Sequence, residues 1–362
     1  MLTDTSEYMH CLRKKIRGNR SSILITIFLL AVIIVTLPTT MTTATSTNRV
    51  YGQQPDRMDL NTTDSSANIQ NVTVKKVQVG DIDIAYKMFG NGEPILLLPG
   101  GSAGMNAWDP SFINDLASNH TVIVFDPRGV GNTTIGSNPY TMQQLANDTA
   151  GLLDALKIQN ANVLGYSLGS YIAQQLALTN PEKVSRLILA GASCGGKESM
   201  PKPPEFLNLQ NELVNKISNN VTISREENIE LLNATLGAGW IRLHPESLEN
   251  VTEGKGFFGS ISPEAQEGQN NIGHSWEATN WDGVCEELTK LAKPTLIITG
   301  TDDNEYQPHE NSLILAEKIP GAWLVQIENA SHAVMDQYPD EIGKILQTFL
   351  STTTTTTTTQ PD

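Results

Sequence analysis

Short, continuous apolar runs alternate along this chain with stretches of helical periodicity, and this alternation restricts the fold more than any other feature. Such runs are typical of strands buried on both faces of a parallel sheet. Strands that alternate with helices indicate right-handed crossovers within one mostly parallel sheet. The runs occupy residues 95–99, 121–126, 161–165, 184–190, 294–300 and 322–328, and the helical stretches occupy 141–157, 168–179, 310–319 and 340–350.

Two further strands precede these runs. Residues 72–79 and 81–89 alternate apolar and polar side chains on either side of a turn at Gly80 and Asp81, which predicts an antiparallel hairpin. The sequence therefore predicts an α/β fold with a mostly parallel eight-stranded sheet flanked by helices.

The alternation stops between Gly195 and Glu286, after the sixth predicted strand. This segment is rich in Asn, Glu and Gly and shows only weak helical patterns. It is too long for an ordinary connection between two strands. We expect a mainly helical cap over residues 195–286, inserted into a folded domain that spans residues 71–350.

Both ends of the chain have the composition of non-globular segments. Residues 1–22 are basic and are expected to stay in the cytosol, and the apolar run at 23–37 predicts a signal peptide or a membrane anchor. Residues 38–70 predict a disordered linker, and residues 351–362 a disordered Thr-rich tail. We expect the folded domain to lie on the extracellular face, either membrane-anchored or secreted.

The net charge of −15 and the isoelectric point near 4.8 argue against a nucleic-acid partner, because phosphate binding needs a basic surface. The sequence contains no glycine-rich phosphate loop and no cluster of cysteine and histidine with metal-ligand spacing. We therefore expect neither a cofactor nor a metal.

Cys194 and Cys285 would both lie outside the cell, whereas Cys11 precedes the apolar run and would stay inside. Disulfides persist in an extracellular setting. We expect two buried, unpaired thiols at Cys194 and Cys285, with a bridge across the base of the insertion as the alternative.

The pattern G-x-S-x-G, typical of a hydrolase nucleophile, occurs at both Ser102 and Ser167. A nucleophile elbow needs a buried strand before the serine and a helix directly after it. Ser167 has both, because an apolar run precedes it and residues 168–179 follow as an amphipathic helix. Ser102 is followed by MNAWDP, which is no helix start, and Pro110 delays the next helix. We therefore expect Ser167 to be the nucleophile.

The first copy of the pattern then has a different role. Acyl transfer needs amide donors that point to where the oxyanion develops. One donor would be the amide of Leu168, directly after the nucleophile, and the other would come from the glycine-rich loop after the third strand. We assign the second donor to Gly101, with Ser102 as the alternative, and a plain turn remains the competing interpretation.

From Val72 to Leu350 the chain resembles the α/β-hydrolase superfamily, specifically the single-domain branch of esterases and lactonases with a cap after the sixth strand. Many members carry histidine where Pro99 stands here, but the oxyanion amides belong to the backbone. The resemblance also implies that Asp126 and Arg128 hold a structural turn. The stretches that carry it are, in order, LLLPGG, FDPRGVGNT, GYSLG, ITGTDDNEYQP and ASHA.

The order of catalytic residues in this superfamily, Ser…Asp…His, implies the rest of a triad. His332 follows the last strand, where the histidine of the superfamily lies, and would act as the base. The acid lies after the seventh strand, where the superfamily spacing selects Asp303, with Asp302 as the alternative. The acid would orient the imidazole without taking its proton.

The residues and the resemblance together predict a serine hydrolase that cleaves a carboxylic ester or a lactone of a small molecule through an acyl-enzyme on Ser167. A proline-iminopeptidase-like peptidase, a carbon–carbon hydrolase and a cofactor-free haloperoxidase use the same triad and remain alternatives. A non-catalytic ligand-binding module is the alternative from a different class.

Overall fold

The computed structural model describes residues 72–218, 221, 224–244 and 260–352. The predicted basic N-terminus, apolar segment and linker, and all but the start of the Thr-rich tail, lie outside these residues. Within the described ranges, no helix is long and apolar enough to cross a membrane.

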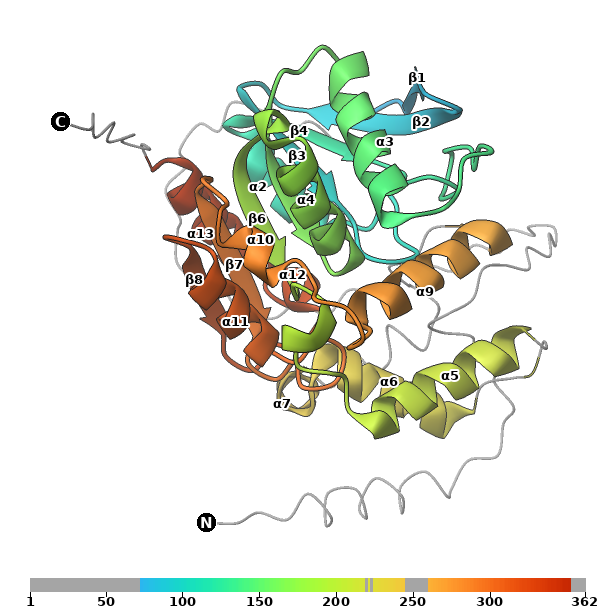
Figure 1. The fold of residues 1–362 in the computed structure, drawn as a ribbon. Coiled ribbons are helices and arrows are strands. Elements are labelled where there is room, and N and C mark those ends of the chain that lie inside the picture. Colours follow the sequence, from blue (N-terminus) through green and yellow to red (C-terminus); the bar gives the residue numbers. More distant parts are fainter. Residues whose placement is uncertain (1–71, 219–220, 222–223, 245–259, 353–362) are drawn as a thin grey trace, which may run out of the picture.

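The centre of the molecule is one eight-stranded sheet with the strand order β1-β2-β4-β3-β5-β6-β7-β8 (Figure 1). The β1–β2 and β2–β4 pairs are antiparallel and the remaining pairs are parallel, so both the hairpin and the mostly parallel sheet are confirmed. The strands are β1 Lys75–Val79, β2 Ile82–Phe89, β3 Glu93–Leu98, β4 His120–Phe125, β5 Ala161–Tyr166, β6 Val184–Ala190, β7 Thr295–Gly300 and β8 Trp323–Ile327.

Both faces of the sheet are covered by helices, which explains why the central strands are apolar throughout. Successive side chains of a strand point to opposite faces, so Leu96 and Leu98 of β3 join one core while Ile95 and Leu97 join the other. The first core contains side chains of α3 Met142–Ala155, α4 Leu168–Thr179, α10 Cys285–Leu288 and α11 Glu310–Lys318. The second contains those of α2 Pro110–Ala117, α12 Val334–Gln337 and α13 Pro339–Leu350.

Local sequence signals explain where these helices begin. Asp109 accepts hydrogen bonds from the amides of Ser111 and Phe112 and so caps α2, with Pro110 in its first turn. Thr141 caps α3 in the same way through the amide of Gln144.

Helices also fill the described part of the segment between β6 and β7, where the sequence predicts an insertion. They lie together beyond one end of the strands (Figure 1), and three of them contribute to a small apolar core that includes Phe206, Leu213 and Leu232, together with Ala333 from after β8. These elements are η3 Gly196–Glu198, α5 Pro204–Ser218, α6 Arg225–Leu236, α7 Ala238–Leu243 and α9 Pro263–Glu277.

Cys194 and Cys285 form a disulfide with their Cα atoms 5.0 Å apart, so the expectation of two unpaired thiols is wrong. The physical reason is a backbone contact that the sequence does not reveal. The amide of Val284 donates to the carbonyl of Cys194 at 2.9 Å, which brings the two ends of the insertion together. The bridge therefore closes the base of the insertion.

Candidate active site

Ser167 occupies a strained turn between β5 and α4. Its φ of 54° and ψ of −122° lie in a region that serine rarely adopts. The flanking glycines leave no space for a side chain. A Cβ on Gly165 would lie 2.3 Å from the carbonyl oxygen of Gly169, and a Cβ on Gly169 would lie 2.2 Å from that of Leu98. The local sequence thus fixes the serine at the start of α4.

Three side chains form a hydrogen-bonded chain at this turn. His332 Nε2 lies 2.9 Å from Ser167 Oγ, and His332 Nδ1 lies 2.8 Å from Asp303 Oδ2. Asp303 is 1% exposed and His332 is 6% exposed. An ionised carboxylate can only accept a hydrogen bond, so Nδ1 carries the proton and Nε2 is free to accept the hydroxyl proton of the serine. This arrangement can activate a serine for attack on a carbonyl carbon.

Asp303, rather than Asp302, faces the imidazole. Its second oxygen accepts the amide of Gln307 at 2.8 Å, so both carboxylate oxygens are held. The Asp302 carboxylate instead lies beside the start of α7, because a Cβ on Gly239 would be 2.6 Å from Asp302 Oδ2.

Two aromatic rings hold the histidine. The ring of Tyr306 stacks on His332 with a centroid distance of 4.7 Å, and the ring of Tyr166 lies at 5.6 Å. The Tyr166 hydroxyl also donates to the carbonyl of His332 at 2.9 Å. Burial raises the pKa of Tyr306 to about 12, so this ring stays neutral. Sequence reasoning assigned no role to either tyrosine, although both lie within the quoted motifs GYSLG and ITGTDDNEYQP.

The loop after β3 reaches the nucleophile. A Cβ on Gly100 would lie 3.3 Å from Ser167 Cβ, and one on Gly101 would lie 3.9 Å from Leu168 Cδ2. The amide of Ser102 donates to Gln269 Oε1 at 2.6 Å and is therefore engaged. The Gly101 amide therefore remains the predicted second oxyanion donor, whereas the Ser102 amide already has a partner.

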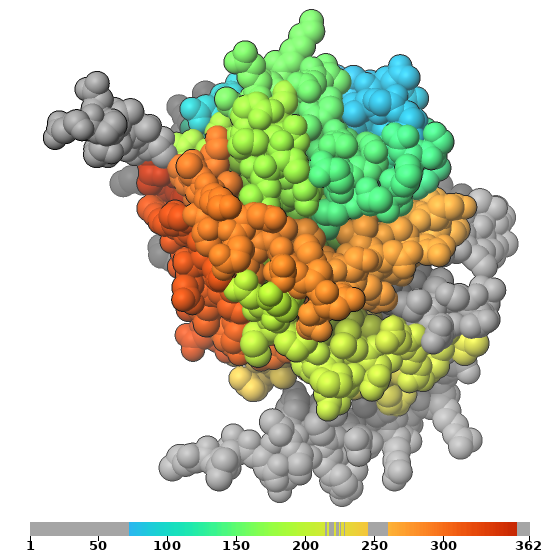
Figure 2. Space-filling model, viewed as in Figure 1, coloured from blue at the N-terminus to red at the C-terminus, as the bar shows by residue number. Residues whose placement is uncertain are grey.

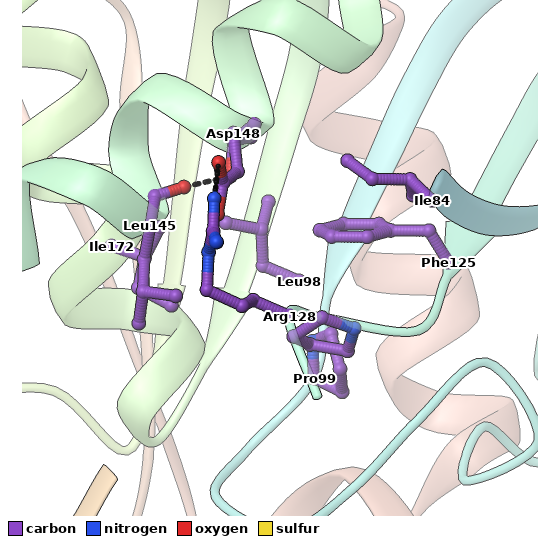
Figure 3. Close-up of a pocket in the computed structure, with 10 residues that line it drawn as sticks. Ile84, Leu98, Pro99, Phe125, Arg128, Leu145, Asp148 and Ile172 are labelled. Carbon is purple, nitrogen blue, oxygen red and sulfur yellow. Dashed lines mark hydrogen bonds and ion pairs between the residues drawn. The ribbon is translucent and has the colours of Figure 1, made fainter. Parts of the chain in front are cut away.

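Asp126 and Arg128 lie apart from this chain of residues. Asp126 accepts the amides of Met105 and Asn132, each at 2.8 Å. Arg128 donates to both oxygens of Asp148, and this buried pair borders the small cavity of Figure 3, which none of the predicted site residues lines. Both residues support the turn after β4.

Among the described residues, no three His, Cys, Asp or Glu side chains are grouped so that they could hold a metal ion.

Comparison with known proteins agrees with this fold. A family model described as "alpha/beta hydrolase fold" matches residues 93–339. A protein of Azorhizobium caulinodans described as a carbamate hydrolase is 30% identical over 275 residues, which cover 75% of this chain and 96% of that protein. The rhodomycin D methylesterase of a Streptomyces species is 30% identical over 264 residues, 67% of this chain and 85% of that enzyme.

Solved structures agree with these sequence relatives. The structure titled as Est816, an N-acyl homoserine lactone degrading enzyme, has a TM-score of 0.62 and 27% identity. The match covers 76% of this chain and all of that one.

Proposed function

The chain belongs to the α/β-hydrolase fold family, and on that premise we propose that it is an exported serine hydrolase that cleaves a carboxylic ester or lactone through an acyl-enzyme on Ser167. Hydrolase activity on a small molecule follows from the family and from its enzymatic relatives. The proposal adds three points to this: that the bond cleaved is an ester or a lactone, that Ser167 carries the acyl group, and that the enzyme is exported.

The single observation that carries the proposal is the chain Ser167–His332–Asp303, with contacts of 2.9 and 2.8 Å. In the reaction, His332 takes the proton of Ser167 as the serine attacks the carbonyl carbon. Asp303 keeps the imidazole in the productive tautomer and stabilises the imidazolium without becoming protonated. His332 then returns the proton to the leaving alcohol, which leaves an acyl group on the serine.

The second half of the reaction uses the same groups. His332 removes a proton from water, the resulting nucleophile attacks the acyl carbon, and the acid leaves as the serine regains its proton. In both halves the amides of Gly101 and Leu168 hold the negative charge on the carbonyl oxygen. Loss of one such donor typically costs about 10²- to 10³-fold in kcat.

Relatives support an ester or lactone as the substrate. One of them is named as a methylesterase and another as a lactone-degrading enzyme. Cleavage of an ester or of a lactone breaks a bond between an acyl carbon and an oxygen, which is the step proposed above for Ser167, His332 and Asp303.

Export rests on the apolar run at residues 23–37 and is supported by the disulfide between Cys194 and Cys285, since such bonds persist in oxidising compartments. On this proposal the enzyme works outside the cell, and residues 23–37 hold it at the membrane if they are not cleaved.

Hydrolysis of p-nitrophenyl acetate by the full chain tests the proposal, with Ser167→Ala as the disabling variant and Ser102→Ala as the matched control. We expect activity in the wild type and in Ser102→Ala, and a loss of at least about 10³-fold in Ser167→Ala. Lactones of increasing ring size then define the substrate. Activity that survives in Ser167→Ala would overturn the assignment, and a folded but inactive wild type would favour the peptidase, carbon–carbon hydrolase or binding alternatives.

A further inference from the structure

Helix α9 of the insertion contacts the loop that reaches the nucleophile. The amide of Ser102 donates to Gln269 Oε1 at 2.6 Å, and the Ser102 hydroxyl donates to Gln266 Oε1 at 2.8 Å. Gln269 is 5% exposed, and its Oε1 lies 3.7 Å from where a Cβ on Gly101 would be. Two consecutive residues of the loop thus lie against one buried side chain that is remote in sequence.

The loop needs such support because its conformation is unfavourable for its own sequence. The amide of Ala103 donates to the carbonyl of Gly100 at 3.3 Å, which closes a four-residue turn. Ser102 is the third residue of that turn and has a φ of 59°. This left-handed conformation favours glycine or asparagine over serine. The hydrogen bond from the Ser102 amide to Gln269 in α9 holds the turn in this shape.

The orientation of the Gln269 amide is determined on both sides. Its Nε2 donates to the Tyr140 hydroxyl at 3.2 Å, and that hydroxyl donates to the carbonyl of Arg128 at 3.1 Å. Arg128 is held in turn by Asp148, as Figure 3 shows. The amide of Ser102 can only donate, so the oxygen of Gln269 must face it.

The start of α9 is also anchored to the turn that contains Arg128. The amide of Gly131 donates to the carbonyl of Ser260 at 2.6 Å, and the amide of Ser262 donates to that of Gly129 at 2.9 Å. In Figure 2 the orange surface of α9 adjoins the green surface of the segment that leads into α3. The hydrogen bonds at the start of α9 therefore hold the helix, and with it Gln269, in place beside the loop that contains Gly101 and Ser102.

We propose that Gln269 is a positioning residue of the hydrolase, whose side-chain carbonyl holds the amide of Ser102 so that the preceding amide of Gly101 points at the oxyanion. The inference rests on the proposed function and extends it, because the oxyanion hole is then complete only when α9 of the insertion is in place. Gln269 acts through the loop and does not touch the reacting atoms.

Two variants of the full chain test this inference. Gln269→Leu removes the acceptor of the Ser102 amide and keeps a side chain of similar size. Gln266→Leu is the matched control, because it removes a contact with the Ser102 hydroxyl, one helical turn away, and leaves the amide contact intact. Gln269→Met replaces Gln269→Leu if the latter does not give a cooperative unfolding transition.

The readouts are kcat and KM for p-nitrophenyl acetate, and inhibition by a trifluoromethyl ketone, whose hemiketal places an oxyanion in the hole. For Gln269→Leu we expect kcat to fall about 10- to 100-fold, KM to stay within about threefold, and the inhibition constant to rise by about the same factor as kcat falls. Gln266→Leu should stay within about threefold of the wild type.

The inference would be overturned by wild-type kcat in Gln269→Leu, by an equal loss of kcat in Gln266→Leu, or by a change confined to KM. These outcomes differ from a failure of the proposed function, which would appear first as a wild type without esterase activity or as full activity in Ser167→Ala.

Discussion

At the scale of single residues, the position of the nucleophile depends on glycines that lie so close to neighbouring backbone that no side chain would fit. Gly169 follows Ser167 by two positions, and a Cβ there would meet the carbonyl oxygens of Leu98 at 2.2 Å and Pro99 at 2.6 Å. Neither carbonyl can move freely, because both lie where β3 becomes the loop that reaches the serine. Close packing of backbone thus positions the nucleophile and this loop together.

Gly169→Ala should therefore damage both stability and activity. Overpacking of this kind costs about 1–3 kcal/mol, and we expect at least a tenfold loss of kcat because the loop with Gly101 must shift. Gly273→Ala is the control, since a Cβ at Gly273 in α9 has no atom within 4 Å. That control should gain about 0.5–1 kcal/mol in helix stability and keep full activity. Thermal unfolding measures the change in stability and ester hydrolysis the change in kcat. A Gly169→Ala variant with wild-type stability and kcat would contradict the close contact with the carbonyls of Leu98 and Pro99.

The carboxylate that faces His332 gives the second prediction at this scale. Asp303→Asn should favour the wrong tautomer of the imidazole and lower kcat roughly 10⁴-fold with little change in KM. Asp302→Asn, one residue earlier, should stay within about threefold because its carboxylate does not face the ring. Comparable losses in the two variants, measured by steady-state kinetics, would contradict the assignment of Asp303.

At the scale of elements, the Cys194–Cys285 bridge joins the two ends of the segment between β6 and β7 and closes a separation of 91 residues. Both cysteines are buried, and Cys194 lies just after β6 while Cys285 begins α10. The bridge therefore limits how far the two ends of the insertion can separate in the unfolded chain.

Replacing both cysteines with serine should lower the free energy of unfolding by about 4 kcal/mol, as expected from the entropy of closing a loop of this length. Chemical denaturation of the wild type with and without reductant provides the comparison. The reductant should destabilise the wild type and leave the double variant unchanged. A double variant as stable as the oxidised wild type would show that the bridge does not constrain the chain.

The sheet and the choice of Ser167 over Ser102 rested on local signals, whereas Asp303 and His332 were expected from the resemblance to the superfamily. The apolar runs mark strands, and each of the three residues lies in a short motif close after one of them. The contacts of Gln269 and Tyr306 could not be predicted in this way, and the sequence did not decide between paired and unpaired Cys194 and Cys285. These features depend on contacts between distant segments, such as the 167 positions that separate Ser102 from Gln269.

At the scale of the whole molecule, a buried ionic cluster joins the hairpin, the turn after β4 and helix α3. The guanidinium of Arg128 contacts Asp81 at 2.8 Å and Asp148 at 2.7 Å. The hydrogen bond from Arg128 holds the pKa of Asp81 well below its ordinary value, assisted by the amides of Asn138 and Ser137. Stability should therefore depend on pH through this group.

Because the pKa of Asp81 is depressed in the folded state, its stabilising contribution is complete above the unfolded-state pKa of about 3.9 and is lost as the pH falls further. Asp81→Asn should lower the unfolding midpoint at pH 6, and the difference from the wild type should shrink below about pH 4. Asp83→Asn, which removes an exposed carboxylate two residues later, is the control variant. If the difference in unfolding midpoint between the wild type and Asp81→Asn stayed constant from pH 6 to pH 3, the proposed contribution of the ionised Asp81 to stability would be contradicted.

The central claim is that the hydrolase forms its covalent intermediate on Ser167. Labelling the full chain with a fluorophosphonate and mapping the adduct by peptide mass spectrometry tests it directly, because Arg128 and Lys157 separate Ser102 and Ser167 into different tryptic peptides. The account predicts one adduct per chain, on Ser167, with loss of esterase activity in proportion to labelling. An adduct on Ser102, or complete inactivation without a label on Ser167, would contradict it.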